Sequence, residues 1–191
     1  AAVLAILVAV RPDRLSGVSR SHGSWGAAVA LFGYAIAFSF AYLSLDAGAG
    51  ALILFATVQT TMISAGMIRG ERPRPSEWTG LALAVIGLVY LVSPGLAAPS
   101  PGGALTMVIS GVAWGRYSLA ARGAASPVAA TAGNFIRAAP MAVAVLAAAW
   151  MAGRTHASPA GLQLAMVSGG ITSGLGYAIW YTVLPALRAT P

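Results

Sequence analysis

No cysteine occurs in the chain, so disulfide bonds, thiolate metal sites and cysteine nucleophiles are all excluded. Lysine is also absent, and the acidic side chains are limited to Asp13, Asp46, Glu71 and Glu77. Charged residues make up only 8% of the sequence against 58% hydrophobic residues, and the mean hydropathy is +0.80. These values lie far outside the usual range of soluble globular domains, so we do not expect a water-soluble fold.

Eleven arginines give the chain a formal net charge of +7. An excess of this kind can indicate a nucleic-acid surface. A nucleic-acid surface would gather its arginines on one basic face with interleaved aromatic residues, whereas here most of them flank apolar stretches. We therefore expect no nucleic-acid partner.

Apolar stretches of about the length of a bilayer-spanning helix fill most of the chain. A shorter apolar run over residues 1–10 has no basic leader and no A-x-A site, so we interpret it as the tail of a truncated helix and not as a signal peptide. The full spans are predicted at residues 25–45, 47–68, 78–96, 104–121, 128–151 and 161–187. The expected fold class is an all-α integral membrane protein, a multi-pass helical bundle with six full spans and one partial span.

The arginines concentrate in every second connection between the predicted spans. The connections between these hold only Asp46, no charge at all, and Arg154. By the positive-inside rule, we expect the arginine-rich connections to be cytoplasmic in a multi-pass protein of the inner membrane. The arginines on that side are Arg11, Arg14, Arg20, Arg69, Arg72, Arg74, Arg122 and Arg188.

The predicted spans carry no motif of a known catalytic site. They contain no G-x-S-x-G, no H-E-x-x-H and no pair of acids. His22 and His156 fall in connections on opposite sides of the predicted membrane, so they are not expected to share a metal ion. We expect neither enzyme activity nor a cofactor or metal.

A short sequence repeat links the first full span to the last. The residues Gly-Tyr-Ala-Ile at positions 33–36 recur at positions 176–179. The arginine pattern makes the two copies cross the membrane in opposite senses. Inverted repeats of this kind are typical of secondary transporters, which alternate access around a site near the middle of the membrane.

Three segments resemble one family of membrane carriers. Residues 70–87 resemble the pattern G-E-R-x-x-x-x-x-W-x-G-x-x-L-x-x-x-G, which joins the fourth and fifth helices of EamA-type members of the drug/metabolite transporter superfamily. Residues 113–115, Ala-Trp-Gly, are similar to the motif in the first helix of each EamA repeat. Residues 176–181, Gly-Tyr-Ala-Ile-Trp-Tyr, are similar to the motif of the eighth helix. The resemblance covers nearly the whole chain.

The resemblance implies ten helices in two inverted halves. Residues 1–96 would correspond to part of helix two through helix five, and residues 102–191 to helices six to eight with the start of the loop to helix nine. It also implies an exporter or exchanger of a small metabolite or drug-like solute. Gln59 departs from the family, because many members carry a proline there. The resemblance also implies proton coupling as one possibility, but no acid lies within the spans of this chain to take the proton. The alternatives are facilitated exchange or an acid in the helices that this chain lacks.

Arg137 is the most deeply placed charge in any predicted span. Such a group is costly unless it is paired or faces water. It could hold a carboxylate or phosphate of the substrate, or it could extend to the interface or bond free carbonyl groups. Its nearest polar neighbour is Asn134, one turn earlier. Arg116 lies close to the cytoplasmic end of its span, where extension to the interface is expected.

Aromatic side chains recur at helical spacing in the spans at 104–121 and 161–187. They could line a cavity, or they could pack and anchor the helices. Tyr34 and Phe38 occupy the repeat-equivalent positions of the last span's tyrosines, which favours a shared cavity.

Gln59 and Thr60 could bind substrate or bond a neighbouring helix. The predicted substrate-binding residues are Tyr34, Gln59, Trp114, Tyr117, Asn134, Arg137, Tyr177, Trp180 and Tyr181.

The expected partners are the lipid bilayer and a small-molecule substrate, and a homodimer is left open. Gly111-x-x-x-Gly115 and Gly170-x-x-x-Gly174 place small residues on one helix face, where we expect close helix packing. If these faces bound other proteins instead, the chain would be a membrane scaffold or assembly subunit without transport. An intramembrane enzyme is the second rival hypothesis.

Overall fold

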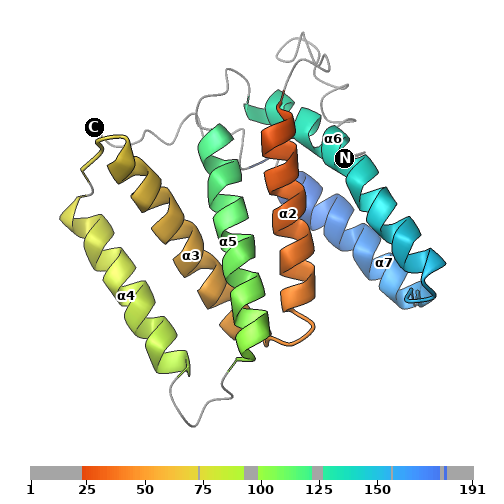
Figure 1. Ribbon diagram of the computed structural model, residues 1–191, viewed down its shortest axis with the longest axis horizontal. Helices are drawn as coiled ribbons and strands as arrows, with labels where there is room; N and C mark the ends of the chain where they lie inside the picture. Colours follow the sequence, from red (N-terminus) through yellow and green to blue (C-terminus); the bar gives the residue numbers. More distant parts are fainter. Residues whose placement is uncertain are drawn as a thin grey trace. The chain divides into compact units, whose positions relative to one another are not determined.

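The computed structural model describes residues 23–72, 74–92, 99–121, 127–155, 157–176 and 179. All regular structure in these ranges is helical, which confirms the predicted all-α class (Figure 1). By contacts the chain divides into the α3–α5 unit, Val29–Ala120, and the α6–α7 unit, which comprises Ala1–Ala28 and Ala121–Pro191. The helices are α2 (Trp25–Ala41), α3 (Ala47–Ile68), α4 (Pro75–Val92), α5 (Pro101–Ala121), α6 (Pro127–Met151) and α7 (Pro159–Val167), which continues as the π-helix η2 (Ser168–Leu175).

Proline and glycine set most of the helix ends. Four helices begin with a proline, whose fixed φ and missing N–H suit the first helical position. At the end of α3, Gly70 has φ +86°, its N–H donates to the Met67 carbonyl at 2.9 Å, and the Glu71 N–H donates to the Gly66 carbonyl at 3.0 Å. Gly153 ends α6 in the same way, with φ +66°. Both ends are Schellman motifs, in which glycine adopts the left-handed conformation that other residues avoid.

The observed helices differ from the predicted spans at several ends. α2 stops at Ala41 and not at residue 45, because the chain turns there through the bonds Leu43 N–H to Phe40 and Ser44 N–H to Ala41. α4 begins at Pro75 and is described to Val92. The later part of the predicted last span lies outside the described residues. The division into residues 1–96 and 102–191 stays a prediction.

Two of the described helices are long and apolar enough to cross a membrane, judged by length and composition. They are Ala47–Ile68 and Ala129–Met151, and only 22% of the most apolar window of each is buried. Trp25–Ala41 and Trp78–Gly87 are shorter apolar helices. α4 exposes a run of large apolar side chains that includes Leu83, Ile86 and Tyr90. Contiguous apolar surface of this extent is rare on soluble monomers.

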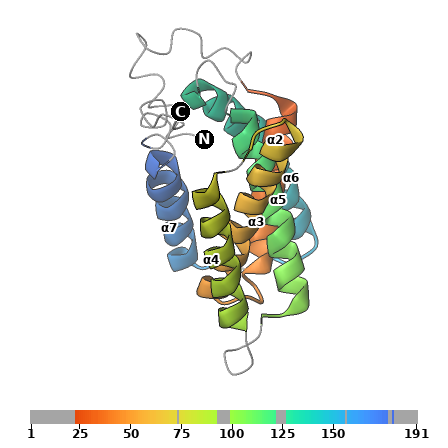
Figure 2. The same ribbon diagram turned by 90° about the vertical axis from the view of Figure 1, so that its left-hand side faces the viewer.

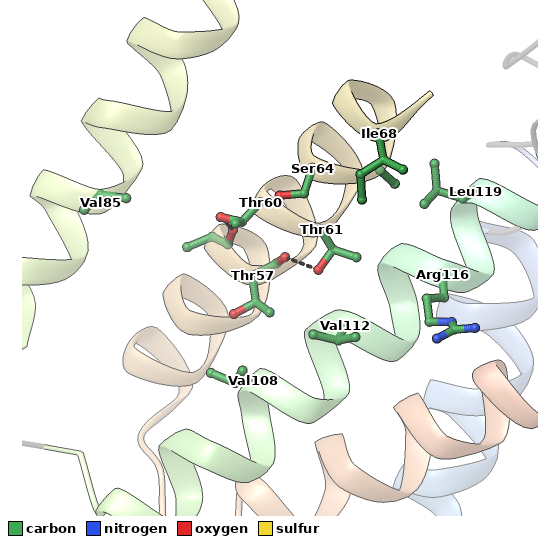
Figure 3. A pocket seen from close by; sticks show the side chains of 12 residues that line it. Thr57, Thr60, Thr61, Ser64, Ile68, Val85, Val108, Val112, Arg116 and Leu119 are labelled. Atoms are coloured by element: carbon green, nitrogen blue, oxygen red, sulfur yellow. Dashed lines mark hydrogen bonds between the residues drawn. The ribbon is translucent and has the colours of Figure 1, made fainter. Parts of the chain in front are cut away.

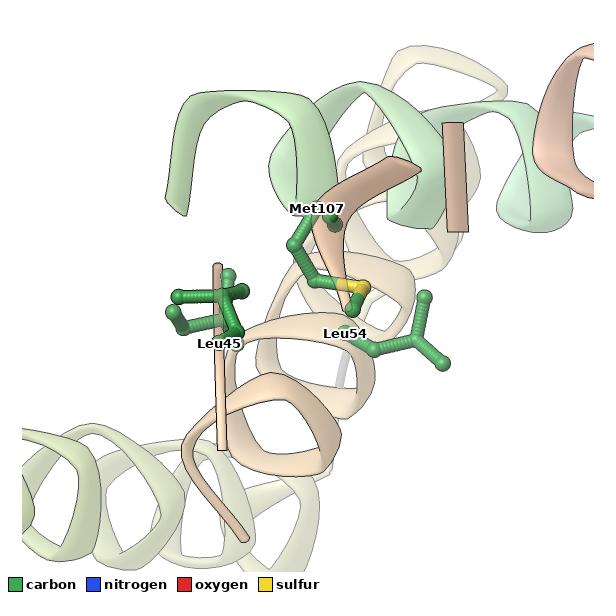
Figure 4. Packing of buried hydrophobic residues seen from close by; sticks show 5 residues of the cluster. Leu45, Leu54 and Met107 are labelled. Atoms are coloured by element: carbon green, nitrogen blue, oxygen red, sulfur yellow. The ribbon is translucent and has the colours of Figure 1, made fainter. Parts of the chain in front are cut away.

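The α3–α5 unit has a small core built around a hairpin of α2 and α3. Leu45, Leu54 and Met107 meet there, together with Ala41 and Ile53 (Figure 4). Met107 is fully buried, and its flexible thioether chain fills the space between α5 and the hairpin. The core therefore fixes α5 against both helices of the hairpin.

Glycines let α5 approach α3 closely. A Cβ atom added at Gly111 would lie 2.6 Å from Cβ of Thr57, and one added at Gly115 would lie 2.8 Å from Cγ2 of Thr61. The predicted packing role of Gly111-x-x-x-Gly115 is thus confirmed. Since both pairs advance by four residues in the same direction, α3 and α5 run parallel. Their C-terminal ends therefore lie at the same end of the unit.

Candidate functional site

A groove of about 820 Å³ lies within the α3–α5 unit, and it is bounded by α3, α4 and α5 (Figure 3). α3 forms its floor, while valines of α4 and α5 form apolar walls. One end is marked by Ile68 of α3 and Leu119 of α5. The lining residues are Ala56, Thr57, Thr60, Thr61, Ser64, Ala65, Ile68, Val85, Val108, Val112, Arg116 and Leu119.

Four hydroxyl side chains follow the groove along α3. Thr57, Thr60, Thr61 and Ser64 recur at positions i, i+3, i+4 and i+7, so they share one side of the helix. We call them the hydroxyl stripe. The stripe places hydrogen-bonding groups in the middle of a helix that is otherwise apolar.

The three threonines of the stripe donate their hydroxyl hydrogens to their own helix. Oγ1 of Thr57 donates to the Ile53 carbonyl at 2.7 Å, and that of Thr60 donates to the Ala56 carbonyl at 2.8 Å. Oγ1 of Thr61 donates to the Thr57 carbonyl at 2.8 Å (Figure 3). Each hydroxyl oxygen keeps acceptor capacity after this bond. Thr60 is exposed, whereas Thr57 and Thr61 pack beneath the glycines of α5. Thr60 is therefore placed to accept a hydrogen bond from an N–H or O–H group in the groove.

Arg116 is the one charged residue among those that line the groove. It follows Gly115, which packs on Thr61 near the middle of the floor, and in Figure 3 its guanidinium points away from α3. The side chain is exposed. No group of three or more histidine, aspartate or glutamate side chains that could hold a metal ion is found among the described residues. The groove thus combines apolar walls with a few hydroxyl acceptors, and its one charged lining residue turns its guanidinium away from α3.

Two of the predicted site residues, Tyr34 and Trp114, meet where α2 packs on α5. The rings of Tyr34 and Trp114 are nearly perpendicular with centroids 4.2 Å apart, and Phe38 continues the stack at 5.5 Å from Tyr34. Tyr117 is only 1% exposed. Ser110 strengthens the same contact, because its hydroxyl donates to the Tyr34 carbonyl at 3.1 Å. These aromatic side chains pack against one another, which is the arrangement expected of the packing interpretation.

Asn134 and Arg137 lie on α6 and contact the start of α2, within the α6–α7 unit. Oδ1 of Asn134 accepts from the Ser24 N–H at 2.9 Å. Nη1 of Arg137 donates to the Gly133 carbonyl at 3.0 Å, and its guanidinium carbon lies 6.0 Å from the centre of the Trp25 ring. The arginine thus bonds a carbonyl of its own helix and lies at the outer limit of a cation–π contact. Substrate binding by these two residues stays a prediction.

The remaining predicted residues are placed as follows. Gln59 is exposed and is not among the lining residues of the groove, although the adjacent Thr60 is. Tyr177, Trp180 and Tyr181 lie outside the described residues. No contact of these residues with the rest of the predicted site is therefore described.

The hydroxyl stripe was missed in the sequence analysis, which weighed Gln59 and Thr60 by their depth in the span. The sequence does contain a pattern that predicts this stripe. The segment T-V-Q-T-T-M-I-S over residues 57–64 has hydroxyls at i, i+3, i+4 and i+7, the spacing of one helix face. Gln59 falls between these positions and so points elsewhere.

One relative provides a comparison. The chain is 50% identical over 169 residues to the Uncharacterized protein PA1977 of Pseudomonas aeruginosa, and the match covers 88% of this chain. No family model matches the chain, and no solved structure matches it. The matched segment is 58% of the relative's length, which makes the relative about 290 residues long. The chain thus corresponds to little more than half of the protein that it resembles.

Proposed function

We propose that the chain forms part of a multi-pass membrane carrier of the EamA type. The carrier moves a small metabolite or drug-like solute across the inner membrane by alternating access, as an exporter or exchanger. Its arginine-rich connections face the cytoplasm. The observation that carries this proposal is the hydroxyl stripe along an open groove in a long apolar helix.

The apolar surface around the hydroxyl stripe supports a membrane location for this groove. About four fifths of the most apolar window of α3 is not buried within the protein, and α4 exposes large apolar side chains. A bilayer would cover this surface at no hydrophobic cost. Polar groups at that depth in a membrane are costly, and they typically face a bundle interior or a solute pathway. The stripe meets this expectation, because it lies on the floor of a groove.

The length of the relative agrees with the proposed architecture. A protein of about 290 residues has room for ten spans of about 20 residues each with their connections. The repeated Gly-Tyr-Ala-Ile segment supports two halves of opposite orientation. No aspartate or glutamate lines the groove in the described part of the chain. We therefore propose exchange or facilitated movement through the groove, without a proton-binding acid there.

The scaffold hypothesis has less support in this arrangement. It used two glycine faces as surfaces for a partner protein, that of Gly170 and Gly174 and that of Gly111 and Gly115. In the α3–α5 unit that face already packs against Thr57 and Thr61 of α3. The carrier therefore remains the proposal.

Transport should depend on the accessible hydroxyls of the stripe. We expect the double variant Thr60→Val and Ser64→Ala of the full-length protein to lower solute uptake in everted membrane vesicles. The loss should be roughly two- to tenfold for each hydrogen bond to the solute. Uptake is measured with a panel of labelled small metabolites and drug-like compounds, and vesicles without the protein set the background.

The matched control is Thr79→Val on α4. Thr79 is also exposed and its hydroxyl also donates to the carbonyl four residues earlier, Pro75, at 2.8 Å, but it does not line the groove. We expect this variant to transport normally. Equal uptake by the double variant and the wild type would show that the solute does not pass through the groove. Absence of uptake for the whole panel would favour the scaffold hypothesis.

A further inference from the structure

We propose that the groove between α3, α4 and α5 binds an anionic phospholipid of the surrounding bilayer. One acyl chain lies in the groove, and the phosphate lies at Arg69 and Arg72, beyond Ile68 at the end of the groove floor. The inference rests on the proposed function only through the membrane location. Lipid fills the groove when no solute occupies it.

The length of the groove suits an acyl chain. Its floor extends along α3 from Ala56 to Ile68, which is about 18 Å at 1.5 Å per residue. One leaflet is half of the ~30 Å hydrocarbon core, or about 15 Å. Val85, Val108 and Val112 supply apolar walls along this length. A single chain can therefore lie in the groove from the interface to the middle of the membrane.

Positive charge gathers at one end of the groove. Ile68 lines this end of the groove, and Arg69 follows it directly as the residue after α3. Arg69 and Arg72 are both exposed in the connection to α4, so they can turn toward the interface. The opposite end of the groove lies toward the connection that contains Asp46. A phospholipid entering from the arginine side meets a matching charge for its phosphate.

The acids near this end do not cancel the charge. The connection to α4 carries Arg69, Arg72 and Arg74 against a single acid, Glu71, with Glu77 in the first turn of α4. The Glu71 carboxylate lies against Gly66 of α3, where an added Cβ would be 2.8 Å from Oε2. Guanidinium groups bind phosphate through paired hydrogen bonds. Basic sites between spans on the cytoplasmic side are a known mode of anionic lipid binding.

Native mass spectrometry of the full-length protein tests the assignment. The protein is purified in detergent with phosphatidylglycerol or with phosphatidylcholine of the same acyl chains. We expect the wild type to retain phosphatidylglycerol preferentially. Each arginine contributes roughly fivefold to the affinity, so the double variant Arg69→Gln, Arg72→Gln should lose roughly twenty-five-fold. Arg154→Gln, which removes an exposed arginine outside the groove, should retain the lipid like the wild type.

A second variant tests the groove itself. Ser64→Phe fills the floor without removing any arginine, and we expect it to lower phosphatidylglycerol retention to the level of phosphatidylcholine. If the double variant is too unstable to purify, Arg72→Gln alone should show a roughly fivefold loss. Equal retention of the two lipids by the wild type, or unchanged retention by the variants, would refute the lipid site. Selective retention without any solute uptake would refute the carrier and leave the lipid site standing.

Discussion

Replacing Gly111 by leucine should separate α5 from α3 and unfold the α3–α5 unit. An added Cβ alone would lie 2.6 Å from Cβ of Thr57 and 3.0 Å from the backbone oxygen of Leu54. The side chain of Thr57 could rotate, but the carbonyl of Leu54 is part of α3 and cannot move without the helix. Overpacking by a few methylene groups already costs about 1–3 kcal/mol where relaxation is allowed. Four added carbon atoms against a backbone should exceed that range.

The effect is measured as a loss of monodisperse protein in detergent and of a cooperative thermal transition. Gly111→Ala should give a smaller shift in the same direction, within about 1–3 kcal/mol. Gly80→Leu on α4 is the matched control, because an added Cβ there has no atom within 4 Å. Its helix should be stabilised slightly, since glycine is a poor helix former. Equal stability of the Gly111 and Gly80 variants would contradict the close packing of α3 and α5.

This packing was predictable from the sequence in part. The spacing of Gly111 and Gly115 indicated a close helix contact, but the partner helix could not be named, because the apolar spans have hydrophobic residues on every side. In a bilayer, hydrophobicity does not distinguish a packed face from a lipid-facing one. The hydroxyls of α3 were the better signal, since polar groups mark the protected side of a membrane helix. Because Thr57 and Thr61 lie on one face of α3, they would have identified α3 as the packing partner of α5.

Helix existence was easier to predict than helix ends. The starts of α4 and α5 were predicted at residues 78 and 104, whereas both helices begin three residues earlier at a proline, which suits the first turn. The early end of α2 at Ala41 was not anticipated, because residues 42–45 are as compatible with a helix as those before them. The turn there is fixed by the core contact of Leu45 with α5, which lies more than fifty residues away in the chain. The helix propensities of neighbouring residues cannot predict a contact between residues so far apart in the chain.

The role of Asn134 also depended on a distant partner. It was predicted to line a substrate cavity because it lies one turn from Arg137. In the structure it is 5% exposed and accepts a hydrogen bond from Ser24, 110 residues away in the sequence. Ser24 in turn caps α2, because its Oγ accepts from the Ala27 N–H at 3.1 Å. Asn134 therefore satisfies a backbone donor at the start of α2.

Replacing Asn134 by leucine should loosen the start of α2 from α6. Leucine has nearly the same shape, but it leaves the Ser24 N–H without its acceptor. Because Ser24 is exposed, the loss should be about 0.5–1.5 kcal/mol, the net contribution of one hydrogen bond. Asn134→Asp keeps an acceptor oxygen, and a carboxylate is favoured near a helix N-terminus. We expect it to recover part of the loss. The measurement is the thermal unfolding of the full-length protein in detergent.

Gly23 provides an independent test of the same contact. It has φ +88°, and an added Cβ would lie 2.5 Å from Oδ1 of Asn134 and 2.8 Å from the carbonyl oxygen of Ala130. Gly23→Ala should therefore destabilise the protein through both strain and displacement of Asn134. Combined with Asn134→Leu, its effect should be less than additive, because both changes break one contact. If Asn134→Leu instead leaves the unfolding temperature unchanged and abolishes solute uptake, Asn134 acts on the substrate and not on the start of α2.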